Sequence, residues 1–142
     1  MSLANVKLLR FPRVPDERGT LAIVEAGHHV PFEVRRVFYV YGIPEGARRG
    51  AHAHRRLEQV LVCVAGSMDV DLDDGAGKRT VHLADPGEGL LIPTMVWASE
   101  HSMAAGTVYM VLASAHYDES DYFRDYEQFL EAVRADAPSG RA

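Results

Sequence analysis

The sequence predicts an all-β domain, a sandwich or barrel of short strands that ends in a single α-helix. Over residues 5–113, short runs rich in Val, Ile, Tyr and Phe alternate with a period near two, which is typical of strands. Glycine, proline and aspartate separate these runs, and the period changes to that of a helix near the C-terminus. The length of 142 residues suits one domain, which is expected to cover residues 1–142.

The strands follow from this alternation, and the segments between them contain turn residues. Residues 65–67 and 73–77 are expected to be hairpin connections, because glycine adopts a positive φ at little cost, and residues 85–87 form another turn. Many short, evenly spaced strands are typical of a sandwich or barrel, here over about residues 6–113. The expected strands are Val6–Leu9, Thr20–Glu25, Arg36–Tyr41, Arg49–His54, Gln59–Ala65, Ser67–Leu72, Lys78–Leu83, Gly89–Ile92, Val96–Ser99 and Thr107–Ala113.

The C-terminal segment predicts an α-helix over about residues 119–134. Three acidic residues would place negative charge at its start, where the helix dipole favours it: Asp118, Glu119 and Asp121. Residues 136–142 are expected to be a frayed tail. The apolar residues that fit one helical face are Tyr122, Phe123, Tyr126, Phe129, Leu130 and Val133.

The composition excludes several classes of protein. A net charge of −5 argues against general binding to nucleic acids or anionic membranes. The single cysteine excludes an intramolecular disulfide. The longest apolar runs, Val60–Ala65 and Val108–Ala113, are far shorter than the roughly 20 residues that span a bilayer, and the N-terminus lacks the apolar core of a signal peptide. A cytoplasmic protein is therefore expected.

The basic residues are mostly arginine and are unevenly placed. Of the 15 basic residues, 13 are Arg, and six of these lie within residues 35–56. Arginine binds phosphate through a planar fork, so the cluster could form a pocket for an anion. On composition alone, a solvated face is the favoured interpretation.

Two histidines mark the candidate site. In a strand, His52 and His54 point to the same face with their Cα atoms roughly 7 Å apart, while Ala53 points to the other. Such a pair could also be exposed, or one histidine could be a hydrogen-bonded core residue. The pair on one face, with Arg49 close in sequence, favours a functional site.

The spacing around this pair resembles the first cupin motif, G-x5-H-x-H-x3,4-E-x6-G, and cupins are jelly-roll β-barrels. The matching positions are Gly46, His52, His54, Gln59 and Gly66, and Gln59 stands where the motif has its acidic metal ligand. Glu58 is adjacent, but a shift of one residue in a strand reverses the face.

The second cupin motif is matched only in part. Gly87 and Pro93 align with it, whereas Met95 and Ala98 occupy its glycine and histidine positions. Two of the four usual metal ligands are therefore absent, and neither a metal nor a cofactor is expected. Histidines without a metal suit proton transfer, because their pKa lies near neutrality.

Motifs along nearly the whole chain, about residues 6–133, resemble one cupin family. They include RG-x-HAH followed by Gln59, and the tail motif YDE-x-DY-x-R-x-Y-x-x-F over residues 117–129. The further stretches are residues 16–21, 31–39, 59–63, 73–75, 89–90 with Trp97, and 111–114. The chain is similar to the dTDP-4-keto-6-deoxy-D-glucose 3,4-ketoisomerases, also described as WxcM-like.

The resemblance implies a substrate and an assembly. The substrate would be a nucleotide-linked keto sugar whose keto group moves from carbon 4 to carbon 3 through an enediol(ate). The protein would be a homodimer of barrels in which the N-terminal strand crosses to the partner. Neither nucleic acid nor membrane is an expected partner.

The resemblance also implies roles for individual residues. His52 and His54 would carry the proton transfers, with the division of labour between them open. Arg49 is three residues from His52, so it would face the other way unless a bulge near Gly50 redirects it. Arg18, Arg36 and Arg49 would contact the diphosphate or enediolate, and Tyr39, Gln59 and Trp97 would line the pocket.

Alternatives from other classes stay open at this point. One is a cupin sugar-nucleotide epimerase, which also removes a proton beside a ketone. A second is a sugar-nucleotide-binding cupin without turnover, and a third is a metal-dependent dioxygenase of the cupin class.

Overall fold

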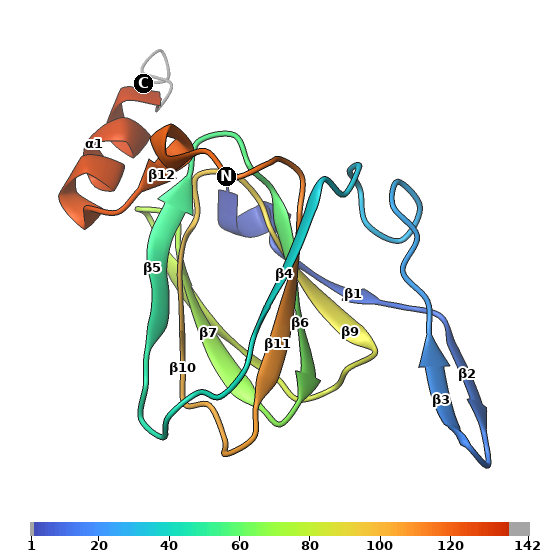
Figure 1. The fold of residues 1–142 in the computed structure, drawn as a ribbon. Helices are drawn as coiled ribbons and strands as arrows, with labels where there is room; N and C mark the ends of the chain where they lie inside the picture. Colours follow the sequence, from blue (N-terminus) through green and yellow to red (C-terminus); the bar gives the residue numbers. More distant parts are fainter. Residues whose placement is uncertain (1, 137–142) are drawn as a thin grey trace.

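Two five-stranded antiparallel sheets face each other in the computed structural model, which describes residues 2–136 (Figure 1). The all-β jelly-roll prediction is confirmed. Of the expected tail at 136–142, residues 137–142 lie outside the described residues. The elements are η1 (Ser2–Asn5), β1 (Lys7–Arg10), β2 (Arg13–Asp16), β3 (Gly19–Ala22), β4 (Arg36–Val40), β5 (Arg49–His54), β6 (Gln59–Ala65), β7 (Met68–Asp73), β8 (Lys78–Leu83), β9 (Glu88–Ile92), β10 (Trp97–His101), β11 (Val108–Ala113), η2 (Glu119–Asp121), β12 (Tyr122–Phe123) and α1 (Tyr126–Asp136).

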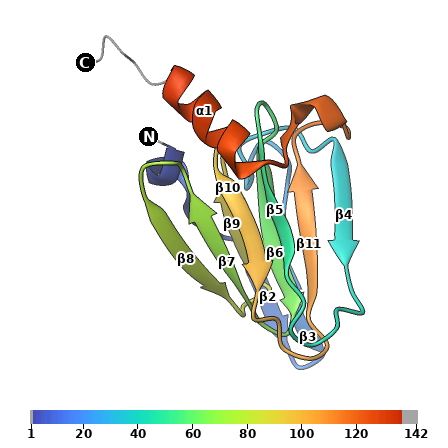
Figure 2. The ribbon, with the colours of Figure 1, turned by 90° about the vertical axis from the view of Figure 1, so that its left-hand side faces the viewer.

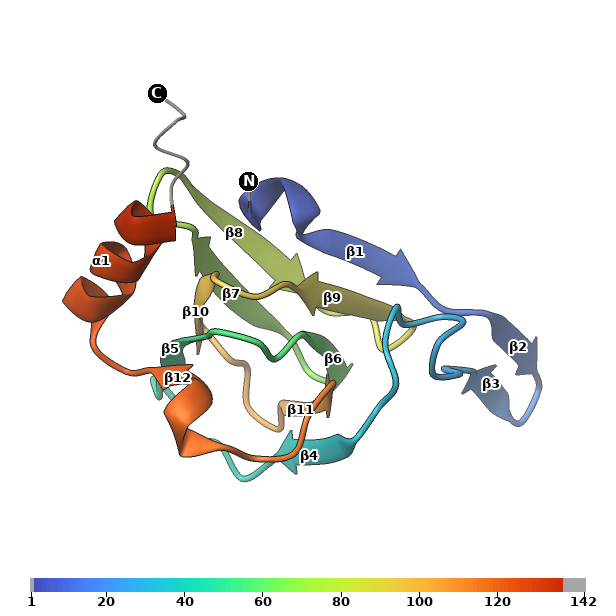
Figure 3. The ribbon, with the colours of Figure 1, turned by 90° about the horizontal axis from the view of Figure 1, so that it is seen from above.

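The strand order defines the two layers. The first sheet has the order β1-β9-β6-β11-β4, and the second has the order β12-β5-β10-β7-β8. The hairpin β2-β3 belongs to neither sheet and projects from the side of the barrel opposite β5 (Figures 1 and 3). Helix α1 lies across one end of the second sheet (Figure 2). No helix of the described residues is long and apolar enough to cross a membrane.

Alternation along the strands builds the core between the sheets. In β7, Met68, Val70 and Leu72 are buried inside the barrel, while the aspartates between them face outward. This is the inward and outward pattern that a half-buried strand requires. The core cluster contains Leu61, Cys63, Met68, Val70, Leu72, Leu90, Ile92, Ala98, Tyr109 and Val111 among others.

The outer faces of both sheets are partly covered. Phe11 and Val30 pack on the outer face of the first sheet against Val60, Val62 and neighbouring side chains. On the second sheet, the aromatic side chains of β12 and α1 cover Ala53 and part of Trp97. This aromatic group of β12 and α1 fixes the C-terminal segment beside β5, the strand that carries the histidines.

The structure agrees with the strand predictions best inside the barrel. Three strands, β5, β6 and β8, have the expected bounds residue for residue. Strand β2 was not expected, and the strand expected over Thr20–Glu25 ends at Ala22. All residues of the β2-β3 hairpin are exposed, so no alternation of burial marked it in the sequence.

The start of the C-terminal helix was predicted wrongly. The helix begins at Tyr126 rather than near residue 119, because Tyr122–Phe123 pairs with β5 instead. Before it, residues Glu119–Asp121 form one 3-10 turn that the Asp118 side chain caps by accepting a hydrogen bond from the Ser120 amide. Burial of Phe123 in the aromatic cluster stabilises the strand over a longer helix.

Candidate active site

His52 and His54 project from β5 toward the inside of the barrel. Their ring centroids are 5.2 Å apart at an interplanar angle of 75°. The ring of Tyr122 completes the group, with its centroid 5.1 Å from that of His52 and 4.3 Å from that of His54. Strand β12 pairs Tyr122 directly with His54, so this contact is built into the sheet.

A buried carboxylate holds His54. Its Nδ1 lies 3.3 Å from Oδ2 of Asp121, and both side chains are almost fully buried. Asp121 is itself fixed by the amides of Arg56 and Leu57, which donate to its two oxygens at 2.8 and 3.1 Å. A carboxylate beside Nδ1 favours the tautomer with the proton on that nitrogen, so Nε2 of His54 is left as the proton acceptor.

The environment of the two histidines differs. Burial lowers the pKa of His52 to about 4, and the neighbouring His54 and Arg124 act in the same direction. Within the described residues, the buried Nδ1 of His52 has no hydrogen-bond partner. Burial also lowers the pKa of His54, but Asp121 opposes this shift. His52 is therefore neutral near pH 7, whereas the imidazolium form of His54 has a local counter-charge.

A cavity of about 80 Å³ lies between the two sheets beside His52. We call it the inner cavity. Its polar lining is Arg49, His52, Gln59, Glu100 and Tyr109, and its apolar walls come from β4, β6, β9 and β11. The structure thus brings Arg49 and Gln59 to the same space as His52.

A bulge explains why Arg49 and His52 face the same space. Ala98 pairs with His52 and the next residue of β10 pairs with Gly50, so Ala51 is an extra residue in β5. Gly50 and Ala51 have φ angles of +79° and +63°. The extra residue reverses the alternation, which places Arg49 on the inner side as the conditional prediction required.

Arg36 and the C-terminal segment close one end of the site. The Arg36 guanidinium lies 5.2 Å from the Phe38 ring, which lines the inner cavity, and 5.6 Å from the Tyr117 ring. The buried Nε of Arg36 has no hydrogen-bond partner among residues 2–136. An unpaired guanidinium beside a cavity suits an anionic ligand.

Next to it, an ion pair crosses the C-terminal segment. Arg124 donates to both oxygens of Glu119, at 2.6 and 2.9 Å, and its guanidinium lies 4.1 Å from the centre of the Tyr122 ring. The pair lowers the pKa of Glu119 to about 2, so its carboxylate stays charged. The ring that contacts both histidines is thereby held from its other side.

Comparisons with known proteins identify the family. The FdtA family model, described as WxcM-like, C-terminal, matches residues 4–134. A curated relative, the TDP-4-oxo-6-deoxy-alpha-D-glucose-3,4-oxoisomerase of Aneurinibacillus thermoaerophilus, is 42% identical over 127 residues, which cover 89% of this chain and 91% of the relative. The chain belongs to the WxcM-like FdtA family.

Solved structures agree with this assignment. A mutant of the 3,4-ketoisomerase QdtA from Thermoanaerobacterium thermosaccharolyticum, in complex with TDP-4-keto-6-deoxyglucose, has a TM-score of 0.91 at 34% identity and covers 93% of this chain and 96% of that chain. WlaRB, a TDP-quinovose 3,4-ketoisomerase from Campylobacter jejuni, has a TM-score of 0.86 at 39% identity, covering 89% and 98%. A dTDP-4-dehydrorhamnose 3,5-epimerase from Bacillus anthracis, at 17% identity and a TM-score of 0.75, covers 86% and 79% and shows the shared fold alone.

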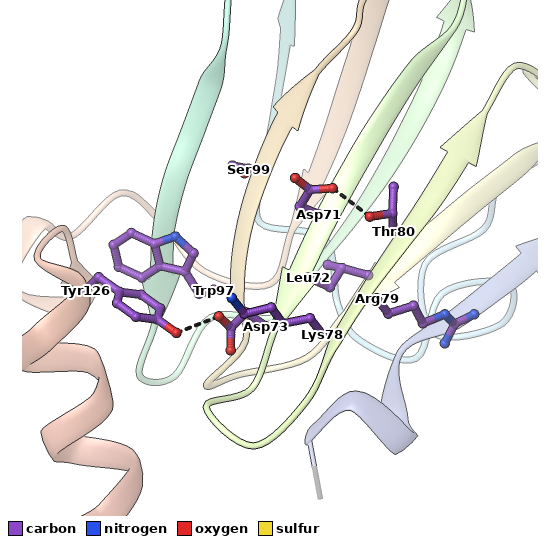
Figure 4. Close-up of a pocket in the computed structure, with 9 residues that line it drawn as sticks. All are labelled: Asp71, Leu72, Asp73, Lys78, Arg79, Thr80, Trp97, Ser99 and Tyr126. Atoms are coloured by element: carbon purple, nitrogen blue, oxygen red, sulfur yellow. Dashed lines mark hydrogen bonds between the residues drawn. The ribbon is translucent and has the colours of Figure 1, made fainter.

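Three of the residues that the WxcM-like resemblance suggested lie elsewhere in the fold. Tyr39 points outward from β4 and is 65% exposed, stacked with Tyr41. Trp97 faces outward from β10, in a groove that also contains Asp73 and Tyr126 (Figure 4). Neither lines the inner cavity with the histidines, because both stand at outward positions of their strands.

Arg18 is the third. It lies at the tip of the β2-β3 hairpin, where its side chain is 84% exposed and paired with Asp16. The hairpin projects away from the barrel, so Arg18 does not reach the histidines of its own chain (Figures 1 and 3).

Two other residues of the candidate site were missed from the sequence. Asp121 was assigned to the start of a helix, and Glu100 lay one residue beyond the expected strand Val96–Ser99. Alternation from buried Ala98 would have placed Glu100 on the inner face, so one signal was present. For metals, residues 2–136 contain no group of three or more His, Cys, Asp or Glu side chains that could hold an ion.

Proposed function

We propose that this chain is a sugar-nucleotide 3,4-ketoisomerase that moves the keto group of dTDP-4-keto-6-deoxyglucose from carbon 4 to carbon 3. The observation that carries the proposal is the histidine pair, with His52 at the inner cavity and His54 held by a buried carboxylate. The activity named for the relative at 42% identity supports the same reaction. The sugar nucleotide named for the QdtA complex supports the same substrate.

His52 is suited to move the proton between the two carbons. The ketone at carbon 4 acidifies the hydrogen on carbon 3, and a histidine that accepts this proton must be in its neutral form. The lowered pKa of His52 keeps it neutral at cellular pH, and it lines the cavity. His52 takes the proton from carbon 3, an enediol(ate) forms, and the same group returns a proton to carbon 4.

His54 is suited to move the proton between the two oxygens. Once the carbon 3 proton has gone, Nε2 of neutral His54 takes the hydroxyl proton from the oxygen on carbon 3, and Asp121 supports the imidazolium that forms. His54 then gives this proton to the oxygen on carbon 4, while the oxygen on carbon 3 becomes the new carbonyl. Both histidines end in their starting protonation states, so the cycle balances.

The arginines supply positive charge for the anionic parts of the substrate. Arg49 lies in the inner cavity and suits the enediolate oxygens, while Arg36 lies at its end and suits the diphosphate. Planar guanidinium groups bind such oxygens in pairs. Gln59, a neutral amide in the same cavity, is suited to a sugar hydroxyl.

The protein is proposed to be a homodimer that exchanges its N-terminal hairpin. An isolated two-stranded hairpin is at best marginally stable in water, and β2-β3 exposes Val14 and Leu21. The outer face of β4 exposes Val37 and Tyr39 in addition. A second copy would cover these apolar residues and give the hairpin a support.

Exchange would also give Arg18 a role. A hairpin that crosses to the partner could bring Arg18 to the partner's cavity, where it would contact the diphosphate. Sedimentation at micromolar concentration should give twice the mass of the chain, and deletion of residues 12–23 should give monomers. A wild-type monomer would contradict this assembly. The cytoplasmic location stays a prediction.

The reaction is tested by incubating the purified protein with dTDP-4-keto-6-deoxyglucose and recording NMR spectra of the sugar. We expect the carbon 3 hydrogen signal to disappear and the 3-keto isomer to form. An epimerase would leave the keto group at carbon 4, and a binding module would leave the spectrum unchanged. Either outcome would contradict the proposal.

A further inference from the structure

A buried carboxylate lies at the inner cavity on β10, the strand that pairs with the histidines' strand β5. Glu100 of β10 is 7% exposed and Tyr109 of β11 is 2% exposed. The Tyr109 hydroxyl donates to Oε1 of Glu100 at 2.9 Å and accepts a hydrogen bond from Nε of Arg49 at 3.3 Å. The three side chains form one chain of hydrogen bonds that crosses from one sheet to the other.

The backbone conformation of β5 allows Arg49, Tyr109 and Glu100 to form these hydrogen bonds. The bulge at Gly50 and Ala51 directs Arg49 inward, and a non-glycine residue at positive φ, such as Ala51, costs of order 1 kcal/mol or more. A Cβ at Gly50 would lie 2.5 Å from Oε2 of Glu100 and 3.1 Å from the Ala98 carbonyl oxygen. Only glycine leaves room for the Glu100 carboxylate beside Arg49.

Stability alone is a poor reason for such a group. The walls next to Glu100 include Leu61, Ile92 and Val111, so an apolar side chain would suit the position. Replacing buried charged networks with hydrophobic residues is often neutral or stabilising. Strain and a buried acid together indicate that the position of Arg49 matters.

The hydrogen bond from Nε of Arg49 to Tyr109 leaves the terminal nitrogens of the guanidinium free. In the described part of the chain, Nε carries the only hydrogen bond of the Arg49 side chain. Both terminal NH2 groups are thus left for a ligand in the inner cavity, which His52 also lines. With Nε held, the plane of the guanidinium is fixed relative to the cavity.

We propose that Glu100 is a positioning residue, which acts through Tyr109 to hold the Arg49 guanidinium against the negative charge that develops on the sugar oxygens. This inference rests on the proposed ketoisomerase function. It assigns Arg49 a role in the transition state rather than in ground-state binding, because the enediolate charge is absent from the bound ketone.

The test uses three variants and one matched control. Tyr109→Phe and Glu100→Leu each break the chain of hydrogen bonds from Arg49 to Glu100, whereas Glu100→Gln keeps an acceptor for the Tyr109 hydroxyl. Tyr126→Phe is the control, since it removes a hydroxyl that donates to Asp73 on the outer face of the barrel. Conversion of dTDP-4-keto-6-deoxyglucose is followed by NMR, with thermal unfolding as the check of folding.

We expect Tyr109→Phe and Glu100→Leu each to lower kcat by about 10- to 100-fold while KM changes by less than about threefold. The double variant should be no slower than the slower single variant, because both break the same chain. Glu100→Gln should recover most of kcat, and the control should match the wild type.

Opposite results would overturn the inference. If Tyr109→Phe keeps the wild-type kcat, or if the two variants act additively, Glu100 does not act through Tyr109. Equal loss in the control would show a general effect of losing a hydroxyl. A wild-type protein that leaves the sugar unchanged would instead refute the proposed function itself, and the role of Glu100 would fall with it.

Discussion

The second sheet carries carboxylates on both faces, and the two faces use them differently. On the inner side, Glu100 of β10 and Asp121 of η2, the turn that leads into β12, are buried, and each is hydrogen-bonded to a side chain of the candidate site. On the outer face, Asp71 and Asp73 lie in a groove of about 370 Å³, where they accept hydrogen bonds from Thr80 and Tyr126. The outer groove is larger than the inner cavity and contains the Trp97 indole, yet the histidines lie on the inner face of the sheet.

The difference teaches that burial, not pocket size, marks the chemistry here. In water, a carboxylate affects its neighbours weakly, whereas in a desolvated setting the same charge shifts a pKa or fixes a tautomer. On the inner face, burial itself lowers the pKa of His52, and the buried carboxylate of Asp121 orients His54. The following experiments compare matched changes on the two faces.

The largest effect is expected from removing the histidines. His52→Asn and His54→Asn should each lower kcat for the 3,4-isomerisation by about 10²- to 10⁴-fold, because each removes a proton-transfer group. His82→Asn is the control on the outer face, where His82 pairs with Asp69 at 2.7 Å. An NMR conversion assay gives the rates, and a variant of the inner pair within tenfold of wild type would refute its role.

A smaller loss is expected from Asp121→Asn. The amide presents an NH2 group that can face Nδ1 of His54, which disfavours the reactive tautomer, so kcat should fall by about 10- to 100-fold. The control is Asp118→Asn, which keeps an acceptor for Ser120 at an exposed position. Because Asp121 also accepts from two backbone amides, unfolding curves are recorded for both variants. Equal rates in the two variants would contradict the role of Asp121.

A third effect concerns stability against acid. The pKa of His52 is about 4 in the folded protein against 6.5 for a free side chain, so the unfolded chain binds more protons between these values. Stability should therefore fall as pH drops from 6.5 toward 4, with a contribution from His52 of about 1–2 kcal/mol at pH 5. His54 shifts in the same direction.

Urea unfolding of wild type and His52→Asn at pH 7 and pH 5 measures this contribution. The variant should lose less stability between the two pH values than the wild type does. His82→Asn serves again as the control and should follow the wild type. If His52→Asn loses as much stability between the two pH values as the wild type does, desolvation of His52 is not the source of the acid sensitivity.

Local patterns predicted most of the barrel and the histidine pair. Alternation and turn residues are properties of neighbouring residues, so β5, β6 and β8 could be predicted from the sequence with their bounds. The same alternation placed His52 and His54 on one face. It failed for the β2-β3 hairpin, where all residues are exposed and no alternation of burial exists.

The partners of the histidines depend on contacts that alternation cannot describe. Asp121 is 67 positions from His54 in sequence. The apolar residues that follow Asp121 have helical spacing, so they fitted a helix from about residue 119 as well as they fitted the observed turn and strand. The bulge at Gly50 and Ala51 depends on pairing with β10, and Glu100 requires that strand to be longer than predicted. Pairing between distant strands, rather than local preference, determines the position of Asp121, the bulge in β5 and the length of β10.

The smallest effect is expected from Trp97→Phe, which bears on the outer groove directly. Trp97 packs against Tyr126 of α1, with ring centroids 5.3 Å apart (Figure 4). Its ring centroid is also 5.7 Å from that of Phe129, so its role there is to support α1. The smaller ring should lower stability modestly, while kcat and KM should stay within about twofold of wild type. Steady-state kinetics with thermal unfolding test this. A large rise in KM without loss of stability would place substrate in the outer groove and reverse the distinction between the two faces.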